Sequence, residues 1–322
     1  MRIKQFLCIS VFLCLTCFQL FADNLIDNFK IYNIDKEVMA ALKLLYSEME
    51  YGNVSNYCKI PENCFENDDY IFNFMNDGSG IIIYGYKGDK KDVSIPNEIE
   101  GFPVTEIACF GKSVERIVIP KTVKEIGPMA FLGCGIKKVD YEENSQLEKI
   151  GNRAFAYNRL SGLSLPRKEI KIYSHAYFMN PIEEINYYKG WKCCKTYYSE
   201  TFFDDDFIYA GISRFGESRP TPFEGLPLLE KVVFEEGCER VEEYMFSMCP
   251  KLSQIEFSAT MKYVFRGAFS SCPSIKKIVI PDKVNKISGA GSYETIFDGK
   301  DFDIEIIKKL LKAGFTMENI GR

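Results

Sequence analysis

Apolar residues recur in a fixed pattern along most of this chain. In one copy, an L-x-x-L-x-L stretch from Val114 to Ile119 precedes Ile126 and the pair Ala130-Phe131. The last two apolar positions of the stretch alternate with polar ones, which predicts a short strand with one buried face. The pair Ala130-Phe131 predicts a second buried segment, in which the small residue allows close packing and the aromatic ring fills the core.

The aromatic residue of each copy gives the period of the pattern. Phe131, Phe155 and Tyr177 are 24 and 22 residues apart, and Phe246 and Phe269 are 23 apart. Tyr177 and Phe246 are separated by 69 residues, which is three periods of 23. We therefore expect eight or nine copies, with one poorly matching copy hidden at about residues 187–210.

A period of 23 residues predicts a solenoid. One such unit cannot bury its apolar side alone, whereas units stacked about 4.8 Å apart pair their strands and build one continuous core. The period lies within the range of roughly 20–29 residues found in leucine-rich repeats. The predicted fold class is an α+β solenoid, a right-handed leucine-rich repeat coil with short strands and helical caps at both ends.

Both ends of the array have cap signals. Residues 35–46 and 303–314 carry apolar residues at helical spacing, and the second run has acids first, lysines last and Gly314 as a stop. Residues 70–86 predict a hairpin with an Asp-Gly turn. The expected parts are a signal peptide (1–22), an N-terminal helical cap segment (23–69), the solenoid (70–302, with an irregular excursion at 187–222) and a C-terminal helical cap (303–322).

The first residues indicate secretion. Arg2 and Lys4 precede an apolar run that ends at Ala22, which is typical of a signal peptide cleaved near that residue. The run is shorter than the roughly 20 residues of a membrane span, so we expect no transmembrane span in the mature chain. Lipidation at Cys17 is the alternative, and it fits less well because Leu15 stands where a small residue is expected.

The repeated motif is I-x-I-P, then V-x-x-I-G-x-x-A-F, then a cysteine. This motif resembles the BspA-type leucine-rich repeats of bacterial surface proteins. The resemblance covers about residues 80–290 and recurs at least five times. Residues 187–222 depart from the motif, and the last unit has Gly291-Ser292 in place of Ala-Phe. The resemblance implies a bacterial protein that is secreted, periplasmic or held at the cell surface, and an adhesive, protein-binding role without a shared catalytic site.

Composition adds mainly exclusions. The chain has 322 residues, 46% apolar residues and a net charge of −5, which is ordinary for a globular protein and unlike a basic nucleic-acid binder. The single histidine, His175, precedes the repeat alanine, so we expect a structural role for it. No catalytic, zinc or nucleotide-binding motif occurs, and Asp204–Asp206 lack the alternation of a calcium loop. We predict neither enzyme activity nor a metal or cofactor.

Of the twelve cysteines, three lie in the signal peptide, three occupy one repeat position and six are of open state, namely Cys58, Cys64, Cys109, Cys193, Cys194 and Cys238. Cys134, Cys249 and Cys272 occupy one repeat position, which predicts a ladder of buried thiols that act as small apolar groups. Cys58 and Cys64 flank Pro61, and in a secreted protein they are the candidates for a local disulfide.

Candidate binding residues come from two places. Residues 187–215 contain ten aromatics in 29 residues, and these rings either fill the core where the coil widens or form interface hot spots. The other source is the outward positions of the predicted strands, which mix both signs and form no basic stripe. The candidates are Tyr188, Trp191, Tyr197, Tyr198, Arg116, Lys138, Asp140, Glu184, Lys231, Glu256 and Lys277.

The sequence thus favours a non-enzymatic binding or adhesion module for an extracellular or host protein or glycan, and disfavours nucleic acid. Two rivals stay open. One is an architectural envelope protein without a dedicated ligand, and the other is an enzyme with a site in the aromatic excursion.

Overall fold

The computed structural model describes residues 60–194, 221–284, 286–289, 295–297, 299 and 302–321. The predicted signal peptide, the predicted helix at 35–46, Cys17, Cys58, Asp204–Asp206, Tyr197 and Tyr198 lie outside these residues.

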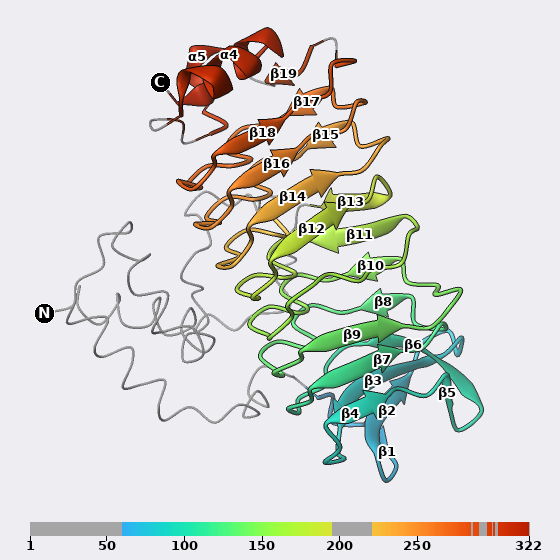
Figure 1. The fold of residues 1–322 in the computed structure, drawn as a ribbon. Coiled ribbons are helices and arrows are strands. Elements are labelled where there is room, and N and C mark those ends of the chain that lie inside the picture. The colour runs from blue at the N-terminus through green and yellow to red at the C-terminus, as the bar shows by residue number, and fades with distance from the viewer. Residues whose placement is uncertain are drawn as a thin grey trace, which may run out of the picture.

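Stacked coils form two ladders of parallel strands (Figure 1). The first ladder contains β4 (Asp92–Ser94), β7 (Arg116–Ile119) and β9 (Lys138–Tyr141), then β12 (Glu184–Tyr187), β14 (Lys231–Phe234), β16 (Gln254–Glu256) and β18 (Lys277–Val279). The second ladder contains β6 (Phe102–Ile107), β8 (Glu125–Ile126), β10 (Lys149–Ile150), β11 (Ile170–Tyr173) and β13 (Trp191–Cys194), then β15 (Arg240–Val241), β17 (Tyr263–Val264) and β19 (Ser288–Gly289).

Alternation along each strand decides which residues are inside. In β7 the buried Ile117 and Ile119 alternate with Arg116 and Val118, which face outward. Neighbouring coils pair in register, so that Ile117 lies beside Val139 and inward positions stack on inward positions. The predicted solenoid of short strands around one continuous core is confirmed.

The third side of each coil carries an aromatic ladder. Rings in neighbouring coils lie 5.0–5.9 Å apart between centroids, without interruption, from Tyr86 to Phe297. The members between them are Phe110, Phe131, Phe155, Tyr177, Phe223, Phe246 and Phe269. The last coil therefore does have its aromatic, Phe297, and the sequence assignment of Gly291-Ser292 to that position is wrong.

The prediction of an extra copy at residues 187–210 is also wrong. Tyr177 stacks directly on Phe223 at 5.7 Å, and β12 pairs directly with β14. In a regular coil the buried second-ladder residue precedes the aromatic by 5 positions, as Ile172 precedes Tyr177, whereas Cys193 precedes Phe223 by 30. One coil thus contains 30 − 5 = 25 additional residues, and we call this coil, residues 182–223, the joint.

The two ends differ. At the N-terminal end, β1 (Phe65–Glu66), β2 (Tyr70–Phe74) and β3 (Ile81–Tyr86) form an antiparallel unit, and β3 joins β6 in parallel. Gly78, with φ of 71°, makes the predicted Asp-Gly turn of the hairpin. The described N-terminal end is therefore made of strands, β5 (Glu98–Ile99) included, and the N-terminal helical cap is not among its elements.

The C-terminal end has the predicted helical cap. Helix α4 (Ile304–Lys312) begins at the N-cap Asp303 and buries Ile306, Ile307 and Leu310. Helix α5 (Met317–Ile320) begins with a capping box at Thr316. Within the described residues, no helix has the length and apolar character to cross a membrane.

Candidate functional site

The outward positions of the first ladder bring most of the predicted charged residues into two groups. Before residue 160, Asp140 Oδ2 lies 2.7 Å from Arg116 Nη2, and its Oδ1 lies 2.9 Å from Lys138 Nζ. The cations hold the pKa of Asp140 below its usual range, although desolvation alone would raise it. This first group therefore neutralises much of its own charge.

The second group lies after residue 180. Lys231 Nζ is 3.4 Å from Glu184 Oε1 and 3.3 Å from Glu256 Oε1, and the hydrogen bond to Glu256 leads the causes that raise the pKa of Lys231. Lys277 is exposed in register with Gln254. Pairs as exposed to solvent as these are screened and contribute little stability, so they order the side chains more than they stabilise the fold.

The first ladder is interrupted between the two groups. Residues 161–165, which we call the ladder break, form no strand, and β9 and β12 belong to separate sheets. On its far side, the Glu183 N–H donates a long hydrogen bond of 3.4 Å to the Ser161 carbonyl. Gly162 stands at a strand position, where glycine is unfavourable, and the backbone here does not join the ladder.

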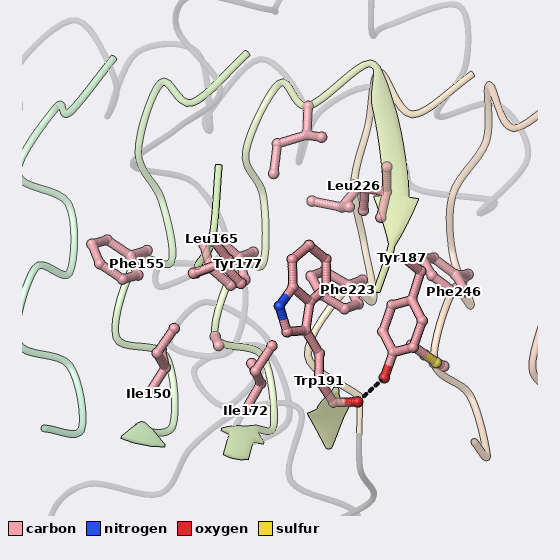
Figure 2. Close-up of a cluster of buried hydrophobic side chains, with 14 of the residues drawn as sticks. Ile150, Phe155, Leu165, Ile172, Tyr177, Tyr187, Trp191, Phe223, Leu226 and Phe246 are labelled. Carbon is pink, nitrogen blue, oxygen red and sulfur yellow. Dashed lines mark hydrogen bonds between the residues drawn. The ribbon is translucent and has the colours of Figure 1, made fainter. Parts of the chain in front are cut away.

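Of the aromatic candidates of the joint, the structure describes Trp191, which fills the core, and Tyr188. Trp191 is 5% exposed, and its indole Nε1 donates to Pro166 O at 3.2 Å. Figure 2 shows the Tyr187 ring edge-on to Trp191, and the Tyr187 hydroxyl donates to the Trp191 carbonyl. Trp191 is therefore not available at the surface as a binding residue. Tyr188 is half-buried beneath the Arg167 guanidinium, 5.4 Å from the ring centroid.

His175 belongs to a polar group that spans the joint. Its Nε2 lies 3.2 Å from Glu224 Oε2, and Ser247 Oγ donates to Glu224 Oε1 at 3.0 Å. Desolvation would raise the pKa of Glu224, but the bonds from His175 and Ser247 hold it below the usual range. Since the serine donates to the carboxylate and not to the imidazole, the group is not built as a nucleophile and base.

The predicted cysteine ladder is confirmed. Cys134, Cys249 and Cys272 are buried, and desolvation raises the pKa of Cys134 to about 12. Asn180 occupies the same repeat position, where its Nδ2 donates to Phe155 O and Tyr177 O at 2.8 and 2.9 Å. The cysteine thiols donate weaker hydrogen bonds to the equivalent carbonyls, for example Cys272 Sγ to Phe246 O at 3.1 Å. These thiols are therefore structural.

The predicted Cys58–Cys64 disulfide is not formed, because Cys64 carries a free thiol. Cys109 is disulfide-bonded instead. The six-residue spacing of the predicted pair carried no information on which cysteines the fold brings together. In the part of the chain that the structure describes, His, Cys, Asp and Glu side chains form no group able to hold a metal ion.

The structure reveals a surface that the sequence analysis missed, at the second ladder. The Arg–aromatic patch consists of Arg240, Tyr244, Tyr263, Phe265 and Arg266. The Arg240 guanidinium lies 4.8 Å from the Phe265 ring centroid, and the Arg266 guanidinium lies 5.9 Å from that of Tyr244. The Tyr263 and Phe265 rings are 6.2 Å apart, and Tyr263 is 45% exposed. Two neighbouring coils thus exchange arginine–aromatic contacts in both directions.

Local contacts hold this patch in place. Arg240 Nε is 2.6 Å from Glu242 Oε1, and the Tyr244 ring covers Gly267, where a Cβ would lie 2.3 Å from Cε1 of the ring. The sequence did contain a signal. The position before the buried residue of the second ladder is charged in Glu125, Lys149 and Lys171, whereas Tyr263 places a ring there, and Phe265 adds a second ring two residues later.

Comparisons with known proteins agree with the coil pattern. The family described as "BspA type Leucine rich repeat region" matches residues 89–207 and 216–297 in six copies. In fold, the chain is similar to a leucine-rich repeat protein from Bacteroides ovatus (20% identity, TM-score 0.50, 72% of this chain and 57% of that one). A leucine-rich repeat protein of T. pallidum gives 18% identity and a TM-score of 0.42 over 78% of this chain and 96% of that one. At 20% identity the likeness to the Bacteroides ovatus protein shows the fold alone. None of the curated proteins compared with this sequence matches it.

Proposed function

Because this chain belongs to the BspA-type leucine-rich repeat family, we propose that it is a non-enzymatic binding module for an extracellular or host protein or glycan. The Arg–aromatic patch is the observation that carries the proposal. Tyrosine and arginine are enriched among the residues that dominate binding energy at interfaces. Here Tyr263 is 45% exposed on a strand that is paired on both sides. Because the backbone is already ordered, binding would cost little conformational entropy.

The predicted outward residues of the first ladder are a second contact region in this proposal. An ordered row of charges stands on this face, formed by Arg116, Lys138, Asp140, Glu184, Lys231, Glu256 and Lys277, and the half-buried Tyr188 lies beside it. Because most of these charges already have partners within the chain, they would set specificity and rate of association more than affinity.

We also propose that the protein works outside the cytoplasm, by secretion or at the surface. The predicted signal peptide at residues 1–22 supports this location. The disulfide of Cys109 supports it independently, because structural disulfides persist mainly in oxidising compartments.

The test is a binding survey of the mature chain, residues 23–322, against extracellular-matrix and envelope components. For each ligand found, Tyr263→Ser and Arg240→Ser should weaken binding at least tenfold, since each removes a central contact of the patch. Lys192→Ser, an exposed position on the same ladder, is the matched control. Ligands retained at full affinity by both patch variants would contradict the assignment of the site, and an absence of any ligand would favour the architectural rival.

A further inference from the structure

Cys109 is joined by a disulfide to a cysteine that lies outside the described residues. Of the eight cysteines that the structure describes, Cys109 alone is disulfide-bonded, and the other seven carry free thiols. These seven are Cys64, Cys134, Cys193, Cys194, Cys238, Cys249 and Cys272. Since the structure contains one chain, the partner of Cys109 is another cysteine of the same chain.

The remaining cysteines are separated by their positions in the sequence. The chain has twelve cysteines, of which eight are described, so 12 − 8 = 4 are left. Cys8, Cys14 and Cys17 lie in the predicted signal peptide, which is removed when a chain is exported. The fourth is Cys58, which stands two residues before Ile60, the first described residue. In the mature chain Cys58 is therefore the single candidate.

The register of the N-terminal sheet shows that Cys58 can reach Cys109. Phe65 of β1 lies opposite Phe72 of β2, and Phe72 lies opposite Ile83 of β3. The Cys109 N–H in turn donates a hydrogen bond of 3.2 Å to the Ile83 carbonyl. Three strand spacings, about 14 Å, thus separate Phe65 from Cys109. The seven residues from Cys58 to Phe65 span up to about 23 Å when extended.

The repeat itself does not account for Cys109. The members of the cysteine ladder follow the aromatic residue of their coil, as Cys134 follows Phe131, whereas Cys109 directly precedes Phe110. The next coils have Ala130 at this position, and the later ones mostly alanine, so packing between coils asks for a small apolar side chain and not for a thiol. A role in covalent bonding explains the cysteine in the first coil.

The first described strand, β1, is weakly held by noncovalent contacts. It has two residues, both exposed, and it stands at the edge of its sheet. Phe65 is 54% exposed, although its ring contacts those of Phe72 and Phe74. Glu66 forms an exposed ion pair with Lys87, and such pairs contribute little stability. The C-terminal end of the solenoid, by contrast, has the helices α4 and α5.

We infer that Cys109 is bonded to Cys58, and that this disulfide is a covalent cap of the N-terminal end. It ties the chain before β1 across β2 and β3 to the first coil. As the S–S bond forms, the two thiols lose two protons and two electrons to a donor disulfide, which leaves as two thiols. The bond joins residues 109 − 58 = 51 positions apart, so it restricts the unfolded chain strongly. A terminal unit of a solenoid has a neighbour on one side only, and a clamp is most effective there.

Peptide mapping of the mature chain, residues 23–322, tests the pairing. The purified chain is equilibrated with oxidised and reduced glutathione, its free thiols are alkylated, and it is digested with trypsin without reduction. Cleavage after Lys59 separates Cys58 from Cys64, so the expected product is peptide 44–59 joined to peptide 92–112, which contains Cys109. Cys109 found alkylated, or joined to any other peptide, overturns the inference.

Hydrogen exchange of the same chain tests the role of the bond. Cys58→Ser should make the amides of β1 and β2 exchange about tenfold faster, because the clamp is lost, and should leave those of β16 and β18 unchanged. Reduction of the wild type with a phosphine should have the same effect. Cys64→Ser removes the neighbouring free thiol and is the matched control, which should exchange as the wild type does.

Equal exchange in Cys58→Ser and in the oxidised wild type would overturn the assignment of the bond as a cap. Neither measurement involves a ligand, and the glutathione buffer sets the redox conditions whatever compartment the protein occupies. The result is therefore independent of the proposed binding function and of the proposed location.

Discussion

The coil that contains the ladder break and the coil that contains the joint depart from the repeat in opposite ways. The first has a nearly regular length, with 22 residues from Phe155 to Tyr177 and rings 5.5 Å apart, yet it loses its strand in the first ladder. The joint carries 25 additional residues, yet it keeps the β12–β14 pairing and its ring stacks at 5.7 Å.

The difference shows which positions of a coil matter for stacking. The additional residues of the joint enter between β13 and the aromatic turn. The first ladder and the ring stack continue across them, whereas the second ladder ends at β13 and starts again at β15 in a separate sheet. The break has no additional length, but Gly162 and Ser164 occupy strand positions. Pairing is therefore lost in one ladder where weak strand formers replace the strand, and in the other where residues are inserted after it.

The strongest test of the joint removes its ring. Phe223→Ala should lower the free energy of unfolding by about 3–5 kcal/mol, as for other buried Phe→Ala changes, because Phe223 is fully buried between Tyr177 and Phe246. Denaturant unfolding followed by circular dichroism measures this. Phe155→Ala, in a coil without additional residues, is the matched variant, and a much smaller loss for Phe223→Ala would mean that the joint is poorly packed.

A smaller effect is expected from the polar group that bridges the joint. Glu224→Gln should cost about 1–3 kcal/mol at pH 7, because it weakens the bonds from His175 and Ser247 to a largely buried group. The pKa of Glu224 is lower in the folded chain than its ordinary value. Its contribution is therefore present above the ordinary carboxyl pKa of about 4.3 and is lost as the pH falls through the folded pKa.

The gap between the wild type and Glu224→Gln should accordingly close in acid. Thermal unfolding at a series of pH values follows it, with the exposed Glu148→Gln as control. A gap that stays constant down to low pH would show that the carboxylate charge does not contribute.

Removal of the additional residues should be tolerated. Deletion of residues 196–220 leaves Cys193 five positions before Phe223, as in a regular coil. Closure of a shorter loop costs less entropy, and we expect a gain of about 1–2 kcal/mol from the reduced length. Loss of cooperative unfolding in this variant would show that the deleted residues hold the two halves of the solenoid together.

The smallest effect is a repair of the ladder break. Gly162→Val places a strand-forming residue where a Cβ has room, and it should stabilise the fold by about 0.5–1 kcal/mol. Hydrogen exchange should then show greater protection of the amides of residues 162–165. Gly162→Ala is the control, and equal gains from both variants would mean that only backbone entropy changed.

The sequence predicted the stacked coils, the ring beside each small residue, the cysteine ladder, the hairpin and the C-terminal helix. Each of these repeats a local pattern or has its own start and stop signals. It failed at the joint because the 25 additional residues are close to one period of 23, so that the spacing from Tyr177 to Phe246 imitated an extra coil. The sequence did not predict the Arg–aromatic patch because its residues belong to two coils, and only stacking brings the rings and the arginines together.

The sequence by itself determined the period, and with it the family, since each unit must bury the same few apolar positions against its neighbours. Only the tertiary structure decided that Tyr177 meets Phe223, that Trp191 is buried and that Cys109, not Cys64, is in a disulfide. These contacts join residues far apart in the chain, and no local pattern specifies them.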